Sequence, residues 1–170
     1  QVLADYYATK SWQTPSPFPE EFSNRPPLFN TPAPVVVTAF TLPELLEAIW
    51  QLKQLKAPAP DSLPNEFWMY LAHTPTVLSY FLDLIKHCYH TGTIPDQWIH
   101  ATVVPIFKQK GSTTAPENYR PIALLNTAYK LYARMLCARL QVGMADRIRA
   151  TQYGFQPGRS TLDPLFFLRR

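Results

Sequence analysis

The stretch Asn118-Tyr-Arg-Pro-Ile-Ala-Leu-Leu-Asn-Thr-Ala-Tyr-Lys130 lies at the centre of the segment around which the chain is organised, residues 102–159. Immediately upstream, Thr102-Val-Val-Pro-Ile-Phe107 is apolar and is followed by Lys108-Gln-Lys-Gly111. An apolar run bounded by Gly, Ser, Thr and Pro predicts a short buried strand that enters a loop. Residues 120–125 predict the returning strand, so the sequence predicts a β-hairpin.

Three cationic side chains are predicted at the neck and tip of this hairpin: Lys108, Lys110 and Arg120. The nearest acid in this part of the sequence is Glu117. Cations gathered in this way form a site suited to phosphate. Charge alone leaves open the alternative of a solvated basic loop.

A helix is predicted after the hairpin, beginning at Asn126 or Thr127 and reaching about Gly143. Its predicted buried stripe consists of Ala128, Leu131, Met135, Ala138 and Val142. Lys130 and Arg134 are four residues apart and share one face, whereas Arg139 projects to the opposite side. The two cations on one face indicate either a solvated surface or a nucleic-acid groove.

Residues 151–161 predict a loop that contains Gly154, Gly158 and Arg159. Tyr153 and Phe155 could stack on a base or fill the core, and the core is the favoured interpretation. Ser160-Thr-Leu-Asp163 has the pattern of a helix cap. We expect the apolar helix that follows it, with its Leu and Phe residues, to belong to a domain that continues beyond this sequence.

The first hundred residues predict mainly helices. A short helical spacing in residues 1–12 precedes a proline-rich linker at 15–34. Thr41-Leu-Pro-Glu44 has the spacing of a capping box and predicts a helix to about Leu55, with Leu45, Ile49 and Leu52 on one face. Further helices are predicted from Pro64, carrying Phe67, Trp68 and Leu71, and from Thr74-Pro75 to Gly92.

Three short segments of the first hundred residues need separate interpretation. His87-Cys88-Tyr-His90 suggests zinc, but Cys88 lies on the apolar stripe and no second ligand pair follows, so ordinary helix-end residues are favoured. Trp98 is expected to anchor a turn beneath the strand that follows. Between these helices, Lys56-Ala-Pro-Ala-Pro-Asp-Ser-Leu-Pro64 predicts a loop held by its prolines.

Composition and charge narrow the class of protein. The chain has 170 residues, 46% of them apolar, which is typical of a globular domain. Cys88 and Cys137 are too few for a disulfide framework, and no apolar run or signal peptide indicates membrane insertion or secretion. We therefore expect an intracellular protein, nuclear or cytoplasmic.

Residues 1–100 carry a net charge of −4 and residues 101–170 one of +8, which points to a polyanionic partner for the second half.

Four blocks in order give a more specific indication. They are the Lys56–Pro64 loop, the strand ending in Pro-x-x-Lys108, Asn118-Tyr-Arg-Pro-Ile with its Tyr-Lys helix, and Gln152-Tyr-Gly-Phe-Gln-Pro-Gly-Arg-Ser-Thr161. Together, across about residues 38–170, they resemble a reverse transcriptase of the non-LTR (LINE-type) retrotransposons.

The resemblance implies an α+β fold, a mostly helical fingers subdomain with a small β-hairpin sheet in a truncated right-hand polymerase fold. Residues 1–40 would be an N-terminal helix and linker, and residues 41–170 the incomplete fingers and early palm. Lys108 and Arg120, with Lys110 nearby, would bind the triphosphate of a deoxynucleotide. Lys130, Arg134, Gln152 and Arg159 would lie near an RNA template and DNA primer, and the rest of the polyprotein is a further expected partner.

The sequence departs from the family pattern in two ways. The loop reads Pro-Ala-Pro-Asp-Ser where the family has Pro-Gly-Pro-Asp-Gly, so a required positive φ would strain Ala59 or Ser62. No Asp-Asp pair is present. The family's palm aspartates bind two Mg²⁺ ions, so we expect no cofactor on this chain, no catalytic residue in it, and no polymerisation by it alone. The alternatives are a degenerate remnant without a biochemical role, or a basic nucleic-acid or protein-interaction module formed by residues 118–160.

Overall fold

The computed structural model describes residues 2–11, 35–59 and 61–169. Among these, helical segments come first in the chain, then a hairpin, then further helices. The helices are α1 (Val2–Tyr6), α2 (Leu42–Trp50), α3 (Asn65–Leu71), α4 (Pro75–Thr91), α5 (Asp96–Ile99), α6 (Thr127–Met144) and α7 (Leu162–Leu168). Short turns of π- or 3-10-helix form η1 (Tyr7–Ser11), η3 (Pro116–Asn118) and η4 (Ala145–Arg147). The strands are β1 (Ala101–Phe107) and β2 (Tyr119–Leu125). The proline-rich linker predicted at 15–34 lies outside the described residues.

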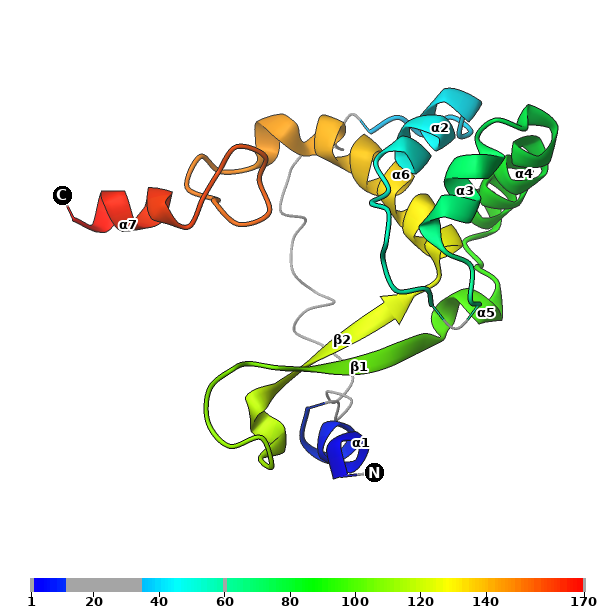
Figure 1. The fold of residues 1–170 in the computed structure, drawn as a ribbon. Coiled ribbons are helices and arrows are strands. Elements are labelled where there is room, and N and C mark those ends of the chain that lie inside the picture. The colour runs from blue at the N-terminus through cyan, green and yellow to red at the C-terminus, as the bar shows by residue number, and fades with distance from the viewer. Residues whose placement is uncertain (1, 12–34, 60, 170) are drawn as a thin grey trace, which may run out of the picture.

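The core of the described residues lies where α2, α4 and α6 meet, with α3 beside them (Figure 1). Its most deeply buried side chains are Phe40, Leu45, Ile49, Leu78, Ile85, Cys88 and Leu131. These residues recur at helical spacing on each helix, so one apolar stripe from each helix faces the shared centre. Cys88 belongs to this core, and its burial raises the pKa of its thiol. That position agrees with the favoured interpretation of the sequence around it.

The residues predicted to begin or end α2 and α4 do so in the structure. The backbone N–H and the hydroxyl of Thr41 both donate to the Glu44 carboxylate at 2.8 Å, which completes the predicted capping box of α2. Pro75 occupies the first turn of α4, where a missing N–H costs nothing. Gly92 ends α4 with φ +68°, a conformation that glycine adopts without steric cost.

Helix α2 ends at Trp50, five residues before the predicted Leu55. The backbone beyond it is bound to α3 instead of continuing the helix. The Asn65 amide donates to the Lys53 carbonyl at 2.7 Å, and the Leu55 N–H donates to the Glu66 carboxylate at 2.6 Å. These contacts join residues distant in sequence, so helical periodicity alone could not predict where α2 ends. Leu52 still packs against the core from the segment after the helix.

Trp98 on α5 is buried, but not under the following strand as predicted. Its indole ring packs against Phe81 of α4 and against Tyr129 and Tyr132 of α6, with ring centroids 6.1–6.3 Å apart. The tryptophan therefore anchors the base of the hairpin to the helices. Asn126, immediately before α6, strengthens this junction because its side-chain amide donates to the Gln97 carbonyl at 2.7 Å.

The predicted hairpin is present, as an antiparallel pair in which Ala101 lies opposite Leu125 and Phe107 lies opposite Tyr119. The prediction that its first strand is buried is wrong, since most of β1 is exposed, including Val104 at 39% and Ile106 at 50%. The reason is visible in Figure 1, where the hairpin extends away from the helical body as an arm. A projecting two-stranded ribbon cannot bury its side chains as a strand inside a larger sheet does.

Helix α6 starts at the predicted residue and ends one residue beyond the predicted Gly143. Ala128, Leu131 and Met135 are buried as expected, but Ala138 and Val142 are exposed. In the second half of the helix the buried positions are instead Arg139 and Gly143. The buried stripe therefore rotates around the helix, because the partner along its second half is the segment 36–44 and not α4.

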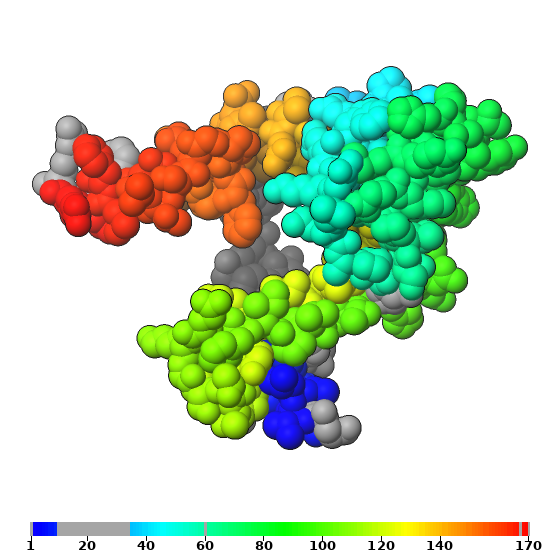
Figure 2. All heavy atoms as spheres, viewed as in Figure 1, coloured from blue at the N-terminus to red at the C-terminus, as the bar shows by residue number. Residues whose placement is uncertain are grey.

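The C-terminal segment forms a second arm (Figures 1 and 2). Residues 151–161 form a loop, as predicted, and Asp163 accepts a hydrogen bond from the Ser160 N–H at 2.7 Å, as the predicted cap requires. The favoured core position for Phe155 is wrong, because this side chain is fully exposed with φ +60°. Among the described residues, no helix has the length and apolar character needed to cross a membrane.

Candidate nucleotide and nucleic-acid interface

The hairpin places Lys108 and Arg120 on the same face. Arg120 lies opposite Ile106 in the antiparallel register, and Lys108 follows Ile106 by two residues. Side chains two apart on a strand point the same way, so Lys108 and Arg120 are diagonal neighbours across the ribbon. Both are exposed. The remaining positions of this face include the aliphatic side chains of Val104 and Ile122.

Neither cation of this pair has a carboxylate partner among the described residues, whose ion pairs are Lys86–Asp83 and Arg139–Glu44. The Lys108 ammonium donates to the backbone carbonyl of Glu117 at 2.6 Å, which directs it across the end of the ribbon. Lys110 follows in the exposed connector, after Gln109 at φ +56°. Unneutralised cations beside one another create a positive potential suited to phosphate oxygens.

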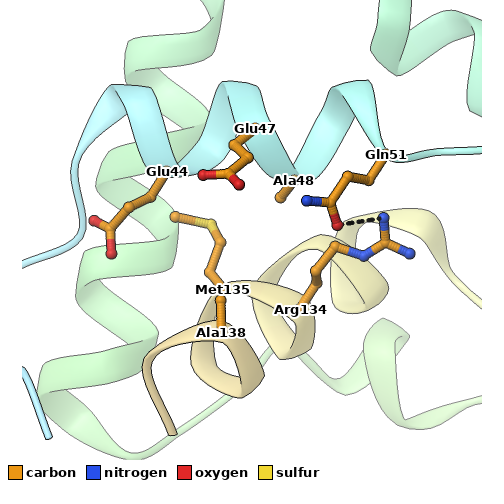
Figure 3. Close-up of a pocket in the computed structure, with 7 residues that line it drawn as sticks. All are labelled: Glu44, Glu47, Ala48, Gln51, Arg134, Met135 and Ala138. Atoms are coloured by element: carbon orange, nitrogen blue, oxygen red, sulfur yellow. Dashed lines mark hydrogen bonds between the residues drawn. The ribbon is translucent and has the colours of Figure 1, made fainter. Parts of the chain in front are cut away.

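Helix α6 carries a second group of predicted residues. Lys130 and Arg134 both line an open groove between α2 and α6, together with Glu47, Gln51, Cys137 and Gln141. In the adjoining pocket, Arg134 reaches across to α2, where its guanidinium donates to the Gln51 side-chain oxygen at 3.5 Å (Figure 3). The sequence had not indicated Glu47 of α2 or Gln51, the residue that caps the end of α2, although their i, i+4 spacing was the available signal.

The remaining predicted contacts, Gln152 and Arg159, lie in the C-terminal loop. The Gln152 amide donates to the Gly154 carbonyl at 3.1 Å, and the Arg159 guanidinium lies 5.6 Å from the centre of the Tyr153 ring. Both side chains are exposed. The loop therefore presents a cation stacked on an aromatic ring, an arrangement compatible with nucleic-acid contact.

The predicted residues therefore occupy three places and not one pocket: the hairpin, the face of α6, and the C-terminal loop. Figure 2 shows the hairpin and the C-terminal arm as two separate projections from the helical body. The separate positions suit a long polyanion better than a small ligand enclosed on all sides.

Arg139 is the charged residue whose role the sequence did not reveal. It is 8% exposed, and its guanidinium donates to Glu44 through two bonds of 2.6 and 2.9 Å. It also donates to the carbonyls of Val36, Thr38 and Ala39, and it lies 4.0 Å above the Phe40 ring. Hydrogen bonding to Arg139 is the main cause that lowers the pKa of Glu44 from 4.5 to about 2. This cation holds the fold together and is not available to a ligand.

In the loop at 56–64, backbone strain was predicted at Ala59 or Ser62, and the structure shows a positive φ at one of these two residues. Ser62, which stands where the family pattern has its second glycine, has φ +57°. Ala59 has no positive φ and is buried at 6% exposure. The Asp61 carboxylate accepts a hydrogen bond from the Leu63 N–H at 3.1 Å, which closes the turn over Ser62. Only one of the two lost glycines therefore forces a strained conformation.

The acids do not form a metal site in the part of the chain that the structure describes. No group of three or more His, Cys, Asp or Glu side chains lies close enough there to hold a metal ion. Glu44 is committed to Arg139, and Glu66 to the Leu55 N–H. The described residues thus do not fit the Mg²⁺ pair of a polymerase, and we derive no catalytic step through it.

Comparison with known proteins finds several relatives of the chain. No protein-family model matches it. It is 32% identical over 130 residues to the probable RNA-directed DNA polymerase from transposon BS of Drosophila melanogaster, covering 75% of this chain and 14% of that protein. It is 30% identical over 149 residues to the RNA-directed DNA polymerase from mobile element jockey of the same organism, covering 86% of this chain and 16% of that protein.

A relative from Xenopus laevis, the uncharacterized 149 kDa protein of transposon TX1, is 30% identical over 132 residues, covering 78% of this chain and 10% of that protein. The chain thus spans a sixth or less of the length of these relatives. The similarity extends over most of its own residues and agrees with the motifs at the hairpin and in the C-terminal loop. Over most of its length, the chain is about 30% identical to part of the reverse transcriptases and polyproteins encoded by non-LTR retrotransposons.

Proposed function

We propose that this chain supplies the nucleotide and nucleic-acid contacts of an RNA-directed DNA polymerase. The observation that carries the proposal is the pairing of Lys108 and Arg120 on one exposed face of a projecting hairpin, without a carboxylate partner among the described residues. A planar guanidinium grips two phosphate oxygens at once, and an ammonium adds a point charge beside it. Lys110 on the connector extends the same positive region.

The nucleic-acid partners would be an RNA template and a DNA primer. The Lys130 and Arg134 face of α6 and the Arg159–Tyr153 stack in the C-terminal loop are the surfaces that support this part of the proposal. Lysine and arginine neutralise backbone phosphates without reading sequence, and an aromatic ring accepts any base. The contacts would therefore be largely independent of sequence.

The fold proposed for the complete polymerase is the right hand, with the hairpin and its helices as fingers. Support comes from the hairpin, which projects from a helical body, and from the C-terminal arm as a second projection (Figure 2). The carboxylates and Mg²⁺ needed for phosphoryl transfer would come from the palm, outside these residues. This chain alone would then bind a triphosphate without extending a primer.

The direct test is deoxynucleoside triphosphate binding by the chain and its variants. Arg120→Ala should weaken binding about ten- to a hundredfold, since a charged hydrogen bond contributes roughly 1.5–3 kcal/mol. Lys108→Ala should weaken it less, because its geometry is looser. Arg134→Ala removes the same charge on α6 and serves as the matched control. If duplex affinity falls in Arg120→Ala while triphosphate affinity does not, these residues are backbone contacts and the assignment is wrong.

A further inference from the structure

The connector between the two strands, residues 108–118, is mostly exposed and polar, with Ala115, Pro116 and Asn118 half-buried, and internal hydrogen bonds close it. The Lys108 N–H donates to the Asn118 carbonyl at 2.7 Å, which extends the ladder past the last paired residues. The Asn118 N–H in turn donates to the Ala115 carbonyl at 3.1 Å. A loop of this composition has no apolar core of its own, so its shape depends on such bonds and on the contact between its 3-10 turn η3 and α1.

Asn118 contributes a side-chain bond in addition to its backbone bonds. Its amide nitrogen Nδ2 donates to the Ser112 carbonyl at 2.8 Å. The side chain thereby lies over Gly111, where an added Cβ would come within 2.4 Å of Nδ2. Gly111 also has φ +81°, which disfavours other residues independently. Gly111 and Asn118 are therefore fitted to one another across the connector.

Two further contacts tie this arrangement to the proposed phosphate site. The Tyr119 hydroxyl donates to the Thr113 carbonyl at 2.9 Å, and its ring packs against Phe107 with centroids 5.3 Å apart. The Lys108 ammonium donates to the carbonyl of Glu117, the residue immediately before Asn118. Movement of Asn118 would thus displace both the backbone partner and the side-chain partner of Lys108.

We propose that Asn118 is a positioning residue, whose amide holds the connector closed so that Lys108 and Lys110 stay beside Arg120. The inference rests on the proposed function, because it concerns the triphosphate site assigned there. A connector held in one shape presents its cations at little entropic cost, whereas an open one must be ordered when the ligand binds. Asn118 need not touch the triphosphate to affect its affinity.

Limited digestion of the chain with trypsin reports directly on the connector, because Lys108 and Lys110 are cleavage sites within it. Asn118→Ala should raise the cleavage rate there about three- to tenfold, the range expected from one lost hydrogen bond. Cleavage after Arg159 provides an internal reference and should not change. Thr113→Ala is the control, since the Thr113 hydroxyl makes no hydrogen bond among the described residues. Equal rates in Asn118→Ala and the unmodified chain would overturn the inference.

Binding of inorganic triphosphate is the second measurement. Asn118→Ala should lower the affinity by about three- to tenfold while the melting temperature stays the same, and Thr113→Ala should leave both unchanged. If Arg120→Ala loses affinity but Asn118→Ala does not, the positioning role is wrong and the proposed function stands. If neither Arg120→Ala nor Lys108→Ala loses affinity, the proposed function fails, and trypsin alone decides whether Asn118 holds the connector.

Discussion

At the scale of single residues, Arg139 joins the most distant parts of the chain. It binds Glu44 at the start of α2 and three carbonyls of the segment before it, all about a hundred residues earlier in sequence. A buried cation is stable only when its donors are satisfied, and these partners provide that. The consequence is a fixed path for the chain where it enters the helical body.

The Glu44–Arg139 pair should make stability dependent on acid. Glu44→Gln should lower the free energy of unfolding by about 2 kcal/mol at neutral pH, as expected for a charged hydrogen bond. Because the folded pKa of Glu44 is about 2 against an ordinary 4.5, the stabilisation is complete above the unfolded value and is lost as pH falls through the folded one. Urea unfolding of both proteins from neutral pH towards pH 3 would measure this, and a difference that does not shrink would contradict it.

A substitution at Ser62 should raise the free energy of unfolding instead of lowering it. Ser62→Gly should stabilise the chain by about 0.5–1 kcal/mol, because relief of a left-handed residue outweighs the added freedom of glycine in the unfolded state. Ala59→Gly is the matched control in the same loop and should destabilise by a similar amount, since Ala59 has no positive φ. Thermal unfolding of the two variants distinguishes them, and the same sign for both would refute the argument.

At the scale of elements, α6 carries one cation that the fold uses and two that belong to the proposed nucleic-acid surface. Arg139 lies on the buried side against α2, whereas Lys130 and Arg134 line the open groove. The two arginines, Arg134 and Arg139, differ only in their position on the helix. Because successive residues of a helix point in different directions, Arg139 faces the segment at the start of α2, whereas Lys130 and Arg134 face the open groove.

Lys130→Ala should weaken duplex binding and reduce the slope of log affinity against log salt by about one, the effect of losing a single phosphate contact. Lys53→Ala removes the same charge from an exposed position in the first half and should have little effect. Fluorescence titrations of both variants at several salt concentrations supply the comparison. Equal losses in the two variants would mean that net charge, and not the α6 face, controls binding.

At the scale of the whole molecule, the charge is divided between the two halves of the chain. The +8 balance of residues 101–170 falls mostly on the hairpin, α6 and the C-terminal arm, whereas the described residues 35–59 and 61–99 hold three Lys against six Asp or Glu, a balance of −3. An extended polyanion is therefore attracted to the second half of the chain and repelled by the helices that precede the hairpin.

Nucleic-acid binding by the chain should be weak, largely independent of sequence and steeply dependent on salt. A log–log slope of several units is expected if several phosphates are contacted. Titration with duplex and hybrid between about 50 and 200 mM salt covers the range in which such losses are large. A flat salt response, or equal binding by duplexes that carry all phosphates as uncharged methylphosphonates, would be incompatible with a phosphate-directed interface.

Much of the local structure could be predicted because its signals are local. The Thr41–Glu44 capping box, the Gly92 stop and the start of α6 at Thr127 each depend on residues within one or two turns of each other, and the two strands of the hairpin are consecutive in sequence. The sharing of a face by Lys130 and Arg134 follows in the same way from helical periodicity. For these features the backbone has few alternatives, and short-range hydrogen bonds select among them.

The sequence by itself determined which segments form helices and strands and where charge accumulates. The tertiary structure alone decided that β1 is exposed, that Arg139 is buried, that α2 stops at Trp50, and that the candidate contacts lie in three places. Each of these depends on which segment lies opposite in space: the hairpin projects from the helical body, Glu44 binds Arg139, and two side chains of α3 bind the backbone that follows α2. Periodicity predicts on which face of a helix or strand a residue lies, but not which segment packs against that face. Contacts between segments distant in sequence depend on how the helices pack.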